Sequence, residues 1–170
     1  MYRNNDDCNP NNDCTVSVSL LAEYCPALKE LFAHRVNFTH DDNLQLIFPS
    51  LTECTFSHND PSVGKAVCLV ISSSPTLKSI SFIYCTLSRE VQTQILLWCK
   101  NPSSRKIDFW CLDLEIEFLK NILVNCPSLK DMTLTECSVD ADDTKEILQN
   151  IAKNLPNKPK IVFFQMFSYR

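Results

Sequence analysis

The sequence contains a single glycine, Gly64, among 170 residues. An average chain of this length would contain about a dozen. Because glycine takes left-handed backbone conformations most readily, its scarcity predicts that the tight turns are made by Asn, Asp, Ser and Pro. It also excludes a glycine-rich phosphate-binding loop. No serine stands in a nucleophile-elbow pattern, and the sequence predicts no enzyme.

Long apolar runs are missing too, so we expect no membrane-spanning segment. The first residues, MYRNNDDCNPNNDC, contain no apolar core of a secretion signal, which makes the cytoplasm the expected location. The net charge is -4. A mildly acidic chain offers no electrostatic attraction for nucleic acid or for an anionic membrane. We therefore expect a protein partner, with no nucleic acid and no membrane.

Apolar residues make up 45% of the chain and charged residues 21%, which is typical of a globular domain. The predicted organisation is a flexible polar tail over residues 1–14, a single domain over 15–165 and a C-terminal tail over 166–170. A short helix predicted over Val16–Tyr24 would cover the first end of this domain.

Apolar residues recur at fixed distances after six prolines that lie 23 to 29 residues apart. These prolines are Pro26, Pro49, Pro75, Pro102, Pro127 and Pro156. In most copies, apolar residues stand two, five, seven, ten and twelve positions further on. The clearest copy is 126–139, CPSLKDMTLTECSV, and its apolar positions are Leu129, Met132, Leu134, Cys137 and Val139. A fixed period of this length predicts a solenoid of stacked units.

Each copy also has a helical half, in which apolar residues recur at helical spacing. The predicted helices are Asp41–Phe48, Val63–Ser73, Ser88–Cys99, Glu115–Asn125 and Asp142–Asn154. Ser88 can cap the third of these, and a last strand is expected at Lys160–Phe164. The prediction is an α/β fold of about five to six strand–turn–helix units, with a parallel sheet on the concave face and helices on the convex face.

These copies resemble the leucine-rich repeat family, in its ribonuclease-inhibitor-like, cysteine-containing type. The resemblance rests on CPAL at 25–28, on CPSL at 126–129, and on Cys85 and Cys137 ten residues after their prolines. Ser104 and Lys158 depart from the first leucine column. The family implies protein–protein binding. Such repeats occur in the C-terminal arms of NOD-like receptors, which are innate immune sensors, and in F-box proteins that select substrates for ubiquitin ligases.

The ten cysteines raise three alternatives, namely disulfides, a metal site and structural packing. Seven fall in repeat columns or helical stretches: Cys25, Cys54, Cys85, Cys126, Cys137, Cys68 and Cys99. No Cys-x-x-Cys pair occurs, and free cysteine behaves as a small buried apolar residue. We therefore expect structural packing. Cys8 and Cys14, in the predicted tail, are the pair placed for a disulfide.

Side chains that alternate with the buried columns should face outward from the concave side of the sheet. Aromatic residues there are typical anchors of protein interfaces, with charged residues as a rim. The alternative is that the rings pack on one another across strands and only stabilise the sheet. The predicted partner-binding residues are Phe32, His34, His58, Tyr84, Lys106, Asp108, Trp110, Asp131, Thr133 and Glu136.

His34 and His58 also raise a zinc alternative, because Cys54, Asp41 and Asp60 are close to them in sequence. Their spacing matches no ligand pattern, so we expect surface histidines, no metal and no cofactor.

The sequence thus predicts a non-enzymatic protein-recognition module, the ligand-sensing or autoinhibitory arm of an intracellular innate immune sensor. The alternatives are the substrate-recognition part of an F-box ubiquitin ligase adaptor, an enzyme inhibitor, and an assembly factor. The last of these would form a contact between copies through the exposed edge at Lys160–Arg170.

Overall fold

The computed structural model describes residues 14–39, 47–58, 64–165 and 167–168. In chain order the elements are β1 (Cys14–Ser17), α1 (Val18–Tyr24), β2 (Glu30–His34), β3 (Val36–Thr39), β4 (Glu53–Ser57), α2 (Gly64–Ser72), β5 (Ser79–Ile83), α3 (Arg89–Cys99), β6 (Lys106–Trp110), β7 (Asp113–Leu114), α4 (Ile116–Asn125), β8 (Asp131–Thr135), β9 (Ser138–Val139), α5 (Thr144–Asn154), β10 (Lys160–Phe164) and β11 (Phe167–Ser168).

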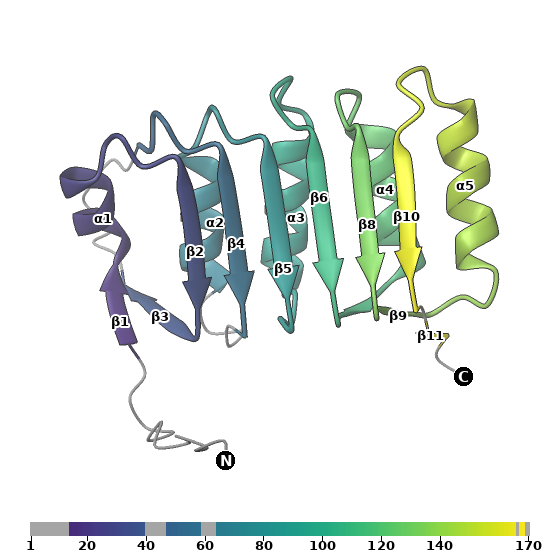
Figure 1. Cartoon of the computed structure of the whole chain (residues 1–170), viewed down its shortest axis with the longest axis horizontal. Helices are drawn as coiled ribbons and strands as arrows, with labels where there is room; N and C mark the ends of the chain where they lie inside the picture. The colour runs from purple at the N-terminus through teal and green to yellow at the C-terminus, as the bar shows by residue number, and fades with distance from the viewer. Residues whose placement is uncertain (1–13, 40–46, 59–63, 166, 169–170) are drawn as a thin grey trace, which may run out of the picture.

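Six of these strands form one parallel sheet in the order β10-β8-β6-β5-β4-β2 (Figure 1). Neighbouring strands pair over five residues each, so that Ile80 lies beside Ile107 and Ile107 beside Met132. Helices α2, α3 and α4 lie behind the sheet in Figure 1. The α/β prediction is confirmed, and so is the last strand at Lys160–Phe164. The face of the sheet away from these helices is called the open face below.

Every second residue of the inner strands is buried, because side chains alternate between the two faces of a sheet. The column seven residues after each proline forms the centre of the core. Phe56, Phe82 and Phe109 are at most 1% exposed, and their rings stack 5.7 and 6.1 Å apart between centroids. At the last strand the same column is occupied by Phe163, which is only partly buried.

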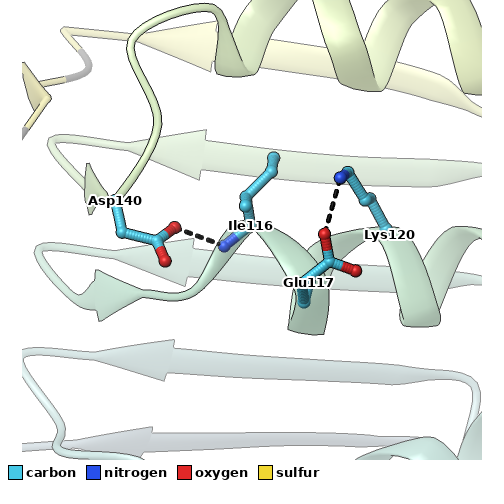
Figure 2. Close-up of polar contacts among 4 residues, drawn as sticks. All are labelled: Ile116, Glu117, Lys120 and Asp140. Atoms are coloured by element: carbon cyan, nitrogen blue, oxygen red, sulfur yellow. Dashed lines mark hydrogen bonds and ion pairs between the residues drawn. The ribbon is translucent and has the colours of Figure 1, made fainter.

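Helix starts follow the sequence closely. Ser88 is the N-cap of α3, and its hydroxyl accepts a hydrogen bond from the Val91 N–H at 3.3 Å, as predicted. Glu115 is the N-cap of α4, but its side chain makes no capping bond. Instead, the Asp140 carboxylate accepts from the Ile116 N–H at 2.6 Å (Figure 2).

Three expectations about local structure were wrong or incomplete. The helix predicted from Val16 begins at Val18, because Cys14–Ser17 form a strand that pairs with β3. Phe167–Ser168, placed beyond the predicted domain end at 165, pair with β9 in a small sheet that also contains β7. The predicted helix over 41–48 falls mainly on residues outside the described ranges, and Ile47 and Phe48 are not helical.

The cysteines whose side chains the structure describes are not paired with one another in disulfides. At the predicted ladder position the thiol of Cys85 donates to the Phe56 carbonyl at 3.3 Å, and the thiol of Cys137 donates to the Phe109 carbonyl at 3.3 Å. Burial raises the pKa of the Cys137 thiol, as expected for a packed residue. Cys25 departs from the expectation, because it is exposed. Cys8 and the side chain of Cys14 lie outside the described part.

Ser104, which departs from the first leucine column, is nonetheless fully buried. Its hydroxyl donates to the Trp98 carbonyl at 2.7 Å, so the polar group keeps a partner inside the core. Among the described helices, none combines the length and the apolar character needed to cross a bilayer.

Candidate functional site

Each strand of the main sheet is followed by a residue in the left-handed backbone conformation. The six residues are Arg35, His58, Tyr84, Cys111, Glu136 and Gln165, with φ between 48° and 55°. Asn, Asp, Ser and Pro were predicted to make the turns, and that prediction was wrong at these positions. The five from Arg35 to Glu136 each donate a backbone hydrogen bond to the neighbouring strand, at 2.7–2.9 Å. This bond holds the turn and aligns the side chains at one end of the open face.

The open face carries a groove of about 850 Å³. Its lining residues come from strands β2 to β10 and the turns after them: Phe32, Thr55, Ser81, Ile83, Lys106, Asp108, Phe109, Trp110, Thr133, Thr135, Glu136, Phe163, Phe164 and Gln165. Three aromatic side chains stand out of the sheet here, since Phe32 is 67%, Trp110 47% and Phe164 56% exposed. Large exposed rings in a hollow are typical of binding surfaces.

The floor of the groove contains an ion pair. The Lys106 ammonium lies 2.8 Å from Asp108 Oδ2, which also accepts a hydrogen bond from the Ser81 hydroxyl at 3.1 Å. The hydrogen bond to Asp108 is the main cause that raises the pKa of Lys106, and the charges of Asp131 and Glu53 add to it. The other oxygen, Asp108 Oδ1, is buried and has no hydrogen-bond partner among the residues that the structure describes. This part of the groove is therefore polar and incompletely satisfied.

A row of aromatic rings runs along one end of the face. The His34 and His58 ring centroids are 5.0 Å apart, and those of His58 and Tyr84 are 4.6 Å apart. The Ser57 hydroxyl lies 3.2 Å from His34 Nδ1 and 2.9 Å from His58 Nδ1. Because it has one proton, it can donate to only one of the two rings, so at least one ring donates to it. Desolvation, then the charges of His34 and Arg35, lower the pKa of His58 and favour its neutral form.

The row continues through Tyr84 to Cys111 and Glu136. The Cys111 thiol donates to Glu136 Oε2 at 3.1 Å. A hydrogen bond with Cys111 is the largest cause that raises the pKa of the Tyr84 hydroxyl, and burial raises the pKa of the Cys111 thiol. Both shifts favour the protonated, neutral forms of these two groups.

The structure divides the predicted partner-binding residues into two groups. Those that line the groove are Phe32, Lys106, Asp108, Trp110, Thr133 and Glu136. The others are His34, His58 and Tyr84 in the ring row and Asp131, which lies beside Lys106 in register. Thr55, Ser81, Phe164 and Gln165 also line the groove and were not among the predicted binding residues. The alternation along the strands does place Thr55, Ser81 and Phe164 on the outward face of the sheet.

The zinc alternative joined His34 and His58 to Cys54 and to two aspartates, Asp41 and Asp60, that lie outside the described residues. Within the part of the chain that is described, no three His, Cys, Asp or Glu side chains gather in a way that could hold a metal ion.

The fold and the open face together define an α/β protein with a parallel sheet, one face of which is grooved. Comparison with models of known protein families, with curated proteins and with solved structures gives no match.

Proposed function

We propose that this chain is a non-enzymatic protein-recognition module that binds a protein partner in the groove of its open face. The observation that carries the proposal is the grouping of Phe32, Trp110 and Phe164, all exposed, around a polar floor. Stable protein interfaces are centred on such aromatic anchors, with charged groups around them. A parallel sheet also needs little reordering on binding, which limits the entropy lost.

The proposal includes a solenoid of the leucine-rich repeat type, with the open face as its concave side. It is supported by the equal five-residue register of successive strands, by the left-handed residue after each strand, and by the thiol bonds of Cys85 and Cys137 to the preceding strand. Each unit repeats the contacts of the one before, as repeat architectures do.

The biological setting that we propose is the arm of an intracellular innate immune sensor in the cytoplasm. A substrate-recognition part of a ubiquitin ligase adaptor and an enzyme inhibitor are alternatives that use the same surface.

A contact between copies at the C-terminal edge is the alternative favoured by a separate observation. Ile161 and Phe163 are only partly buried there, whereas Met132 and Leu134, in the same columns of β8, are fully buried.

The proposal is tested by replacing Trp110, which lines the groove, and Tyr84, in the neighbouring ring row, with alanine together. Loss of central anchors costs about 2 kcal/mol or more, so the affinity for a partner isolated from the native source should fall by about thirtyfold. Leu97→Ala with Val124→Ala is the matched control, because both leucine and valine are exposed apolar residues of helices α3 and α4. Calorimetric titration and circular dichroism measure affinity and folding. Unchanged affinity in the folded Trp110/Tyr84 variant would refute the proposal.

A further inference from the structure

Among the described residues, only one of the two oxygens of the Asp108 carboxylate makes polar contacts. Both of its polar contacts, from Lys106 and from Ser81, go to Oδ2. Within the described residues, Oδ1 is buried and has no hydrogen-bond partner. A buried acceptor without a donor costs about 1–3 kcal/mol. If the carboxylate turns toward the groove, a ligand that donates to Oδ1 as well as to Oδ2 would recover that free energy.

The charges around Asp108 favour a cationic donor. The Lys106 ammonium faces carboxylates on three strands, because Glu53, Asp108 and Asp131 all raise its pKa. Lys160 lies beside Asp131 in register and offsets one of these charges. Negative charge still exceeds positive charge at the centre of the open face, so a cation approaching the groove is attracted and an anion repelled.

The walls of the groove narrow the choice of cation. Trp110 follows Asp108 by two residues on β6, so both side chains point to the open face. The indole is 47% exposed beside the carboxylate. A guanidinium group stacks flat on an aromatic ring, donates two parallel hydrogen bonds to a carboxylate, and is less strongly hydrated than an ammonium. An arginine side chain therefore suits this pair of residues better than lysine.

We infer that the groove recognises a basic segment of a protein partner by seating an arginine between Trp110 and Asp108. This inference rests on the proposed function and names the chemistry of the partner. In the complex, the Asp108 carboxylate turns toward the groove, and the guanidinium takes the place of the Lys106 ammonium and donates to both oxygens. The Lys106 side chain is 50% exposed, so its charge can move into water. Apolar residues flanking the arginine contact Phe32 and Phe164.

The test uses the peptide acetyl-Ser-Leu-Arg-Leu-Ser-amide and its analogue with citrulline, which has the same shape without the charge. Both are titrated into the full chain by calorimetry, with the Trp110 indole N–H followed by NMR. We expect the arginine peptide to bind at least tenfold more tightly, since hydrogen bonds to charged groups contribute about 1.5–3 kcal/mol. The preference should vanish in Asp108→Asn, which keeps an acceptor for Ser81 and Lys106.

Glu117→Gln is the control variant, because it removes one negative charge from α4, where Glu117 pairs with Lys120 (Figure 2). It should keep the tenfold preference. Equal binding of the two peptides, a preference that survives Asp108→Asn, or no binding of the arginine peptide at millimolar concentration would overturn the inference. If one of these outcomes occurs while the Trp110/Tyr84 variant still loses affinity for the native partner, this inference fails and the proposed function stands. The failure of the inference can therefore be told apart from the failure of the proposed function.

Discussion

At the scale of single residues, the unusual feature is how the chain turns without glycine. The six left-handed positions after the strands hold Arg, His, Tyr, Cys, Glu and Gln, whereas Gly64 begins a helix and has no positive φ. A left-handed conformation costs about 1–2 kcal/mol for a residue with a Cβ. The backbone bond to the next strand compensates for this cost, for example Tyr84 N–H to the Trp110 carbonyl at 2.9 Å. Four of the six side chains, His58, Tyr84, Cys111 and Glu136, belong to the ring row.

Arg35→Gly should therefore stabilise the protein. Arg35 has φ 49° and is exposed, so the change removes backbone strain and little packing. We expect the free energy of unfolding to rise by about 0.5–1 kcal/mol, which is the left-handed cost less the extra chain entropy of glycine. Urea denaturation measures it. Glu53→Gly, at an exposed position of β4, should lower stability by about 0.5–1 kcal/mol. A loss of stability in Arg35→Gly would contradict the argument.

At the scale of elements, the start of α4 is capped by Asp140, in the turn after β9, and not by the side chain of its own N-cap residue. The Asp140 carboxylate reaches the Ile116 N–H at 2.6 Å from a position 24 residues later (Figure 2). Glu115 occupies the N-cap without using its side chain. Asp140 thus satisfies a donor that the helix cannot satisfy itself, and it places a negative charge at the positive end of the helix dipole.

Asp140→Ala should lower the free energy of unfolding by about 1 kcal/mol, the usual effect of losing an N-cap side chain. Glu115→Ala should change it by much less, because the Glu115 side chain makes no capping bond. Chemical denaturation of both variants beside the unchanged protein gives the comparison. If the two alanine variants lose equal stability, the capping role belongs to the local sequence and not to Asp140.

Long-range contacts such as this one mark the limit of what the sequence predicts. The period of the prolines was sufficient for the main strands and most helices, because each unit buries the same columns. The two-residue strands β7, β9 and β11 are too short to show any alternation. Val16 and Val18 alternate as in a strand, but were attributed to a helix. The outward residues of the groove could be predicted from alternation, whereas the unpartnered oxygen of Asp108 depends on three-dimensional packing.

At the scale of the whole molecule, the last strand of the main sheet, β10, pairs with β8 along one edge, and no described strand pairs with its other edge. The Lys160 N–H bonds to Lys130, and the Phe164 carbonyl accepts from Glu136, so these groups of β10 face β8. In a parallel ladder the intervening residues, Ile161 and Phe163, direct their N–H and C=O groups to the other side. In the described residues no strand pairs there. Such an edge can pair with another chain.

If two copies meet at this edge about a twofold axis, their β10 strands run antiparallel and Val162, the central residue, lies near its own counterpart. Val162→Lys then places two like charges opposite each other, which disfavours pairing. In sedimentation equilibrium, the unchanged chain of 19.5 kDa should approach twice this mass as concentration rises, whereas Val162→Lys should remain at one chain. Thr55→Lys, in the same row of the open face but on the interior strand β4, should associate as the unchanged chain does. A constant single-chain mass for the unchanged protein into the millimolar range would remove the contact between copies and leave the groove as the surface for partners.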